Sequence, residues 1–167
     1  MQFQESGLGL FGWYDNDMAI FGGKRSNRVH PAGHLWCKFV VYDMVHRHST
    51  GNDRAVGSME LLIEYPIDET APLLIRKLLN FEIDKDLRRN PRKGQPGEGL
   101  GRRAIEALSR SITDEIEILD IKPSARGFWE KMGVEMHREQ KRVNGTLKPA
   151  LTLEHRADAP SASGPRP

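Results

Sequence analysis

Three glycines with the spacing of a phosphate-binding turn stand near the middle of the chain. Gly97, Gly99 and Gly101 lie within the segment PGEGLG, and an amphipathic helical pattern covers residues 99–112. Because glycine has no Cβ, the backbone of such a turn can bend sharply and approach a bound group closely. The first N–H groups of a helix have no partner within the helix and carry partial positive charge. The pattern therefore predicts a seat for an anion such as a pyrophosphate.

Two predicted strands flank this turn and helix. Residues 78–84, LLNFEID, alternate as a strand does, with Leu79, Phe81 and Ile83 on one face. Residues 114–121, DEIEILDI, predict the second strand. We expect these strands to be parallel neighbours, joined by a right-handed crossover through the helix.

A short second helix is predicted after the second strand. Residues 123–133, PSARGFWEKMG, begin with a proline, which suits a first helical turn, and end at a glycine, which commonly follows a last turn. Beyond it, Asn144 and Gly145 form the dipeptide most typical of a hairpin turn and predict two final strands.

This combination resembles the GNAT acyltransferases, which move an acetyl group from acetyl-CoA to an amine. In that family the phosphate loop has the pattern Arg/Gln-x-x-Gly-x-Gly/Ala, and residues 96–101 match its glycines while Pro96 replaces the Arg or Gln. A later family pattern, Ala-x-x-Phe-Tyr-x-x-x-Gly-Phe, is similar to residues 125–134, with Trp129 in place of the tyrosine. The resemblance is good over residues 78–137.

The resemblance implies an α/β (α+β) fold: a mixed, mostly antiparallel sheet of six or seven strands with helices on both faces. We expect one domain over residues 1–156 and a disordered tail over 157–167, which lacks apolar anchors. Residues 1–34 are rich in glycine, with short strands possible at 1–4 and 18–21. The two helices that the family usually has in this region are not evident.

Two more strands are predicted before the glycine turn. Residues 35–45 and 55–65 are rich in β-branched and aromatic side chains. Residues 46–54, HRHSTGNDR, have the composition of a hairpin turn between them.

The resemblance implies that acetyl-CoA, the acyl donor, places its pyrophosphate on the N–H groups of residues 97–102. Arg92 or Lys93, from the preceding basic loop, could reach the phosphates in place of the missing Arg or Gln. The same residues fit a loop that is only solvated. The expected cofactor-binding residues are Ile83, Arg92, Lys93, Gly97, Glu98, Gly99, Leu100, Gly101, Arg102 and Phe128.

Transfer to an amine needs a base, because an ammonium group has no lone pair. The resemblance implies that Glu82 takes this role, with Asp84 two positions on and on the same strand face; Glu60 and Glu64 are further candidates. Each is equally compatible with an exposed strand carboxylate. An indole N–H can donate a hydrogen bond but cannot serve as an acid, so Trp129 would pack instead, leaving water or a serine to assist the departing thiolate.

Composition is that of an ordinary globular protein: 167 residues, 38% hydrophobic, 29% charged and a formal net charge of +2. A single cysteine, Cys37, favours a reducing compartment. No apolar run is long enough for a membrane helix, and the first residues lack a signal-peptide pattern, so we expect a cytoplasmic protein with no membrane partner. His30, His34 and Cys37 suggest zinc, but their spacing favours a histidine-bearing loop, and we expect no metal.

Two other functions fit the same residues. A nucleic-acid-binding protein of this fold would use the clustered basic residues on phosphates, and a degenerate relative would serve only as an interaction module. For the acyltransferase, the glycine-rich segment before residue 35 predicts an open acceptor site. Such a site favours a lysine side chain or an N-terminus of a protein over a small metabolite. The basic cluster consists of Arg88, Arg89, Arg92, Lys93, Arg102 and Arg103.

Overall fold

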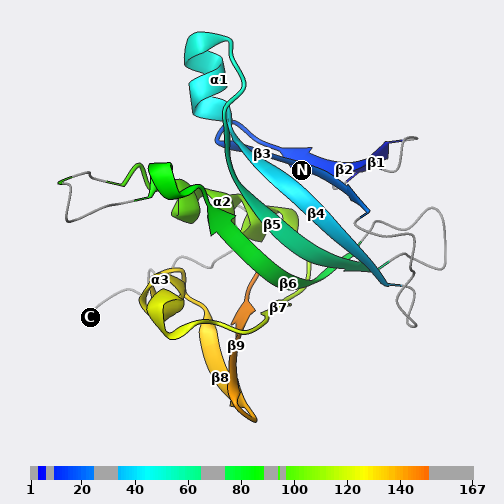
Figure 1. The fold of residues 1–167 in the computed structure, drawn as a ribbon. Coiled ribbons are helices and arrows are strands. Elements are labelled where there is room, and N and C mark those ends of the chain that lie inside the picture. The colour runs from blue at the N-terminus through cyan, green and yellow to red at the C-terminus, as the bar shows by residue number, and fades with distance from the viewer. Residues whose placement is uncertain are drawn as a thin grey trace, which may run out of the picture.

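The computed structural model describes residues 4–6, 10–24, 34–64, 74–88, 94 and 97–150. Arg92, Lys93, Pro96, the first three residues and the expected tail at 157–167 lie outside the described residues. Within those ranges the chain forms one nine-stranded sheet of order β1-β2-β3-β4-β5-β6-β7-β9-β8 (Figure 1). The strands are β1 Gln4–Ser6, β2 Leu10–Tyr14, β3 Met18–Lys24, β4 His34–Asp43, β5 Ala55–Glu64, β6 Leu74–Ile83, β7 Ile116–Ile118, β8 Glu135–Glu139 and β9 Arg142–Leu147.

Of the strand pairs described, only β6 and β7 run parallel, which confirms the expected mixed, mostly antiparallel sheet. The sheet exceeds six or seven strands because the N-terminal segment, where the resembled family usually has two helices, contributes β1, β2 and β3 instead. Three α-helices and two short 3-10 turns complete the described part. They are α1 Met44–Thr50, α2 Leu100–Ser111, α3 Arg126–Lys131, η1 Lys85–Leu87 and η3 Pro123–Ala125.

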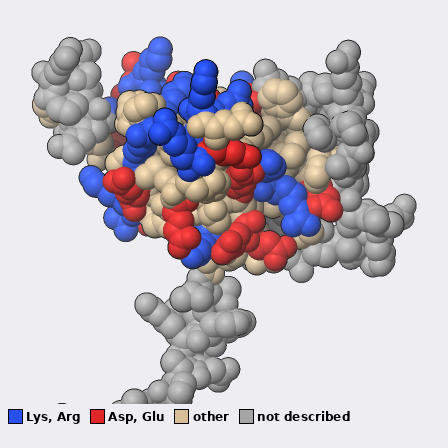
Figure 2. All heavy atoms as spheres, turned by 90° about the horizontal axis from the view of Figure 1, so that it is seen from below, with Lys and Arg blue, Asp and Glu red and all other residues tan. Residues whose placement is uncertain are grey.

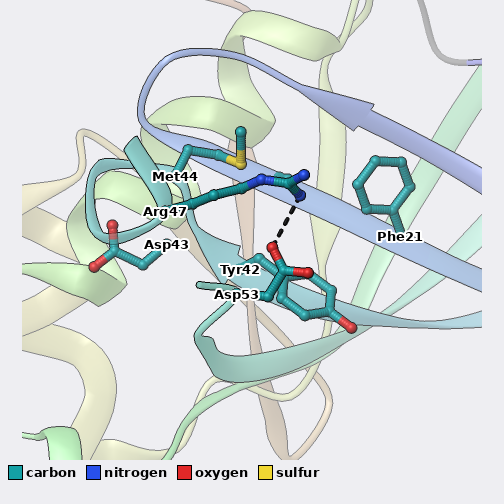
Figure 3. A pocket seen from close by; sticks show the side chains of 7 residues that line it. Phe21, Tyr42, Asp43, Met44, Arg47 and Asp53 are labelled. Carbon is teal, nitrogen blue, oxygen red and sulfur yellow. Dashed lines mark hydrogen bonds and ion pairs between the residues drawn. The ribbon is translucent and has the colours of Figure 1, made fainter. Parts of the chain in front are cut away.

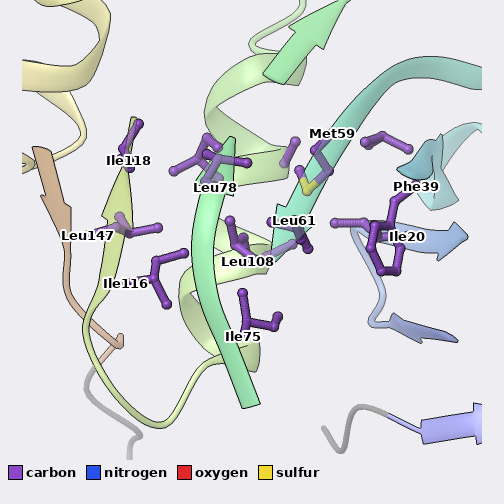
Figure 4. Packing of buried hydrophobic residues seen from close by; sticks show 14 of the residues in the cluster. Ile20, Phe39, Met59, Leu61, Ile75, Leu78, Leu108, Ile116, Ile118 and Leu147 are labelled. Atoms are coloured by element: carbon purple, nitrogen blue, oxygen red, sulfur yellow. The ribbon is translucent and has the colours of Figure 1, made fainter. Parts of the chain in front are cut away.

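The core lies between α2 and one face of the sheet (Figure 4). Helix α2 buries the apolar stripe that its period predicts, and Leu108 is fully buried beside strand residues such as Leu61 and Leu78. Helix α3 lies on the same face, since Phe128 and Trp129 contact the ring of Phe81. Removal of this apolar surface from water is the main contribution to stability.

The opposite face of β3 and β4 is much more open. Phe21, Trp36 and Val40 are 47%, 43% and 37% exposed. The short helix α1 borders this face at one end, where Met44 and Arg47 lie beside Tyr42 (Figure 3). An open face on these strands leaves room for a large molecule to approach.

The segment 46–54, expected to be a turn, is mostly helical. Asp43 caps α1 by accepting a hydrogen bond from the His46 N–H at 3.2 Å, and Gly51 ends the helix with a left-handed φ of 75°. The hydroxyl of Thr50 donates to the carbonyl of His46 at 2.8 Å. These local caps stabilise a short helix where composition favoured a loop.

The final hairpin forms, but its turn is not at Asn144 and Gly145. Both residues lie inside β9, and the turn is at Gln140 and Lys141, where Gln140 has a φ of 54°. A Cβ on Gly145 would collide with Val134 and Ile121, so close packing explains this glycine. The expectation was wrong because the buried Asn144 side chain is used within the sheet.

A bulge in β6 corrects the expected face of that strand. Leu61 pairs with Leu78 and Glu60 with Asn80, so Leu79 is the additional residue. Leu78, rather than Leu79, therefore joins the core face.

None of the helices in the described ranges has the length and apolar character needed to cross a membrane.

Candidate functional site

The glycine turn connects β6, through η1, to the first turn of α2. Gly99 is the N-cap residue, with a left-handed φ of 69°, and a Cβ placed on it would find no atom within 4 Å. The first helical bond after it runs from the Arg103 N–H to the Gly99 carbonyl at 3.0 Å. The preceding N–H groups, of residues 100–102, therefore face the open side of the turn with no capping side chain from Gly99. The sequence predicts an anion site at this turn, and its free N–H groups are compatible with one.

The same turn lies where β6 and β7 separate. The two strands pair only at Lys77 with Glu117 and Leu78 with Ile118, while β6 continues to Ile83. No other described strand pairs with that edge of residues 79–83. The two parallel strands therefore separate beyond Leu78, and the slot predicted between them would have the unpaired edge of residues 79–83 as one wall.

The predicted cofactor-binding residues differ in whether their side chains are buried, packed beside α2 or exposed. Leu100 is 2% exposed, so only its N–H can face a ligand. A Cβ placed on Gly101 would lie 3.4 Å from Phe128 and 3.6 Å from Ile83, which puts these two residues beside the start of α2. Gly97 and Glu98 are exposed in the turn itself. Arg92 and Lys93 lie outside the described residues.

Arg102 points along the helix surface, where its Nε lies 2.7 Å from Glu106 Oε1. The hydrogen bond to Glu106 and the attraction between the charges raise the pKa of Arg102. The Arg102 side chain is 73% exposed. It would have to leave its pair with Glu106 to meet a phosphate at the turn.

A network of charged side chains, which the sequence did not predict, links the glycine turn to the sheet. Arg54, just before β5, meets Glu98 with Nη1–Oε2 and Nη2–Oε1 distances of 3.0 and 3.2 Å, and lies 3.6 Å from Asp43. Arg103 of α2 donates to the same Asp43 at 2.9 Å and to the Asp17 carbonyl at 3.1 Å. These residues are distant in sequence, and no local pattern marks such contacts.

Asp43 is the buried centre of that network, 4% exposed. Its burial alone would raise the pKa of the carboxyl group. Hydrogen bonds from Arg103 and the His46 N–H, with the attraction of Arg103 and Arg54, outweigh this and lower the pKa below its ordinary value. Asp43 is therefore held ionised between two guanidinium groups.

The predicted catalytic carboxylates lie in different settings. Glu82 is exposed on the open face, 2.6 Å from Nη2 of Arg88, whose Nε donates to the Ile83 carbonyl. Asp84 is the first residue past the end of β6, and its N–H donates to the Val56 carbonyl at 2.9 Å, which continues the register of β6 with β5. Its place on the strand face of Glu82 stays a prediction.

The two candidates on β5 are also engaged. Glu60 accepts a hydrogen bond from the Trp36 indole at 3.0 Å. Glu64 pairs with Arg76, whose hydrogen bond lowers the pKa of Glu64. Register places Glu60 and Glu82 on one face of neighbouring strands, nearer to each other than to Glu64.

Trp129 packs as expected of an indole in place of a phenol. It is 6% exposed, and its ring lies 5.0 Å from that of Phe128 and 6.2 Å from that of Phe81, centroid to centroid. It therefore contributes to the core and not to proton transfer.

Two shallow hollows border the open face. One, of about 300 Å³, lies between α1 and the sheet, where Arg47 and Asp53 form an ion pair of 2.9 Å (Figure 3). The other, of about 310 Å³, lies between the paired residues Lys77 and Glu117 and the hairpin of β8 and β9. Among the described residues, no cluster of His, Cys, Asp or Glu could hold a metal ion. The second hollow is lined by Lys77, Glu117, Leu119, Glu139, Gln140, Arg142 and Asn144.

Charge on the surface is mixed. On the face in Figure 2, lysine and arginine side chains lie among aspartate and glutamate. Within the described part of the basic cluster, Arg88, Arg102 and Arg103 each pair with a carboxylate. These three arginines, the described half of the cluster, are therefore not unpaired charges for a nucleic-acid backbone.

Comparison with models of known protein families and with curated proteins found no match. Among solved structures, the chain is similar to a mutant of the toxin AtaT bound to acetyl-CoA and to the C-terminus of the antitoxin AtaR. The identity is 12%, the TM-score is 0.43, and the match covers 67% of each chain. The likeness is too distant to assign a family.

Proposed function

We propose that this chain is a GNAT-type N-acyltransferase that transfers an acetyl group from acetyl-CoA to a primary amine. One observation carries the proposal: the open turn at Gly99 adjoins the unpaired edge of β6 where that strand leaves β7. The turn offers N–H groups to a pyrophosphate. The strand edge offers N–H and C=O groups to a narrow, amide-containing arm. Coenzyme A has both groups, a pyrophosphate followed by an amide-containing pantetheine arm.

In the proposed reaction, the amine nitrogen attacks the thioester carbonyl carbon, the C–S bond breaks and an amide forms. The slot orients the thioester, and the neutral amine approaches from the open face that carries Glu82. Glu82 takes the amine proton through the oxygen that Arg88 does not engage, or through water. The CoA thiolate leaves and is protonated by solvent, since Trp129 is buried and cannot act as an acid. Positioning supplies much of the rate.

The acceptor is proposed to be a lysine side chain or an N-terminus of a protein in the cytoplasm. The open face of β3 and β4 and the shallow shape of both hollows support a large acceptor. A small metabolite would instead be expected in an enclosed pocket.

Calorimetric titration of the full chain with acetyl-CoA tests the donor, and release of free thiol in the presence of lysine-containing peptides tests the transfer. Saturable binding followed by peptide-dependent thiol release is expected. Binding without thiol release on any amine would leave a CoA-binding module, and no binding would overturn the proposal.

A further inference from the structure

The strands β6 and β7 separate because the chain turns away from β6 directly after β7. The last bond toward β6 runs from the Leu119 N–H to the Leu78 carbonyl at 3.0 Å. Asp120 then adopts a left-handed φ of 53°, a conformation that is uncommon for residues other than glycine, although Asp and Asn adopt it more often than most. The next N–H groups bond to β9 instead: that of Asp120 to Asn144 Oδ1 at 3.0 Å, and that of Ile121 to the Val143 carbonyl at 2.6 Å.

Asn144 is buried, 4% exposed, and every polar atom of its side chain is used. While Oδ1 accepts from Asp120, the amide nitrogen lies 3.1 Å from Glu117 Oε1 and 3.0 Å from Glu139 Oε2. Reversing the amide would place NH₂ against an N–H and oxygen against two carboxylates. The orientation is therefore determined by its partners.

The same network reaches the other wall of the slot. The second oxygen of Glu117 lies 2.7 Å from the ammonium group of Lys77, and Lys77 is one of the two β6 residues that still pair with β7. Asn144 thus connects β9, β7 and the bend at the point where the strands separate. A buried amide that meets all its partners fixes one geometry, because a partial set would leave a buried polar group unsatisfied.

We propose that Asn144 is a positioning residue that holds residues 119–122 away from β6 and so keeps the slot open for the pantetheine arm. This inference rests on the proposed function. An asparagine at the separation point satisfies the N–H of a left-handed Asp120 while also bonding to Glu117. Without it, that N–H loses its acceptor, and the bend has no side chain to retain it in the strained conformation.

Two ligands distinguish this role from a general loss of structure. Adenosine 3′,5′-bisphosphate has the nucleotide part of the donor without the arm, whereas acetyl-CoA has both. In Asn144→Ala, we expect affinity for acetyl-CoA to fall about tenfold, as loss of a buried hydrogen bond implies, while affinity for the bisphosphate stays within about twofold. Hydrogen exchange of the Asp120 and Ile121 amides should become faster without any ligand.

Glu139→Ala is the matched control. It removes an exposed partner of Asn144 and leaves the bond to Asp120 intact, so both affinities should stay near the wild-type values. Equal losses for the two ligands in Asn144→Ala, or unchanged exchange at Asp120, would overturn the role of Asn144 while wild-type binding still supports the donor site. Failure of the wild-type chain to bind either ligand would overturn the proposed function and this inference together.

Discussion

Arg54 and Glu98 form a two-bond ion pair, with N–O distances of 3.0 and 3.2 Å, that links the start of β5 to the glycine turn across 44 residues of sequence. The pair with Glu98, followed by the attraction of Glu98 and Asp43, raises the pKa of Arg54 although partial burial opposes this. The Arg54 side chain therefore links the turn to the sheet, in addition to the backbone of the turn itself.

We predict that Arg54→Ala destabilises the fold more than Glu98→Gln. Arg54→Ala leaves the buried Asp43 with Arg103 as its remaining guanidinium neighbour and should cost about 1–3 kcal/mol. Glu98→Gln breaks only an exposed contact and should cost less than about 1 kcal/mol. Urea unfolding of both variants measures the difference, and equal losses would contradict this account of the network.

The charged state of Asp43 should make stability depend on pH. Its pKa is lowered in the folded protein, so its contribution is fully present above the unfolded value of about 3.9 and is lost as pH falls through the folded pKa. Asp43→Asn should be less stable than wild type at neutral pH, and the two should converge in acid. Unfolding curves across this range test the prediction. Asp53→Asn, at an exposed ion pair, is the control and should change little.

Side chains added to the glycine turn should prevent acetyl-CoA from binding. We predict that Gly99→Val with Gly101→Val abolishes acetyl-CoA binding in calorimetry. The side chain at residue 99 would occupy the open space expected to hold the phosphates, and that at residue 101 would press on Phe128 and Ile83 beside the turn. Backbone strain at Gly99, of roughly 1–2 kcal/mol, is a separate effect. Gly51→Val controls for it, since Gly51 has a similar φ of 75°, lies at the end of α1 and also has open space around its Cβ. Undiminished affinity in the double variant would exclude the turn as the site.

Glu82 should affect turnover and not donor affinity. In Glu82→Gln we expect slower transfer with acetyl-CoA affinity nearly unchanged, and the loss should shrink as pH rises and free amine becomes abundant. Asp84→Asn is the comparison, since Asp84 lies beyond the strand and should retain most activity. Wild-type turnover in Glu82→Gln at neutral pH would remove this residue from the mechanism.

The parts of the fold that local patterns encode were predicted well. The period of Leu100, Ala104 and Leu108 gave α2 to within a residue or two, and apolar runs gave β4, β5 and β6. The glycine turn and the parallel pairing after it followed from the order of these elements.

The other features of the fold depend on contacts that a local sequence pattern does not show. Helix α1 forms through the caps at Asp43 and Gly51 against a turn-like composition. Asn144 has the signature of a hairpin turn, yet its side chain is satisfied by Glu117 and Asp120, which precede it by 27 and 24 residues. Arg54 and Arg103 act through partners 44 and 60 residues away. Tertiary hydrogen bonds therefore outweighed local preference at these positions.

Strands β6 and β7 pair over only two residues, and this short pairing also affects how the chain folds. Strands β1 to β6 form a meander of adjacent antiparallel pairs, which close short loops, whereas β7 can join β6 only after α2 has crossed the sheet. Because contacts between distant segments cost more loop entropy, the meander should form first and β7, β9 and β8 should dock last. Two residue pairs then join these units across the sheet, so the C-terminal unit should also be the first to detach under mild denaturant.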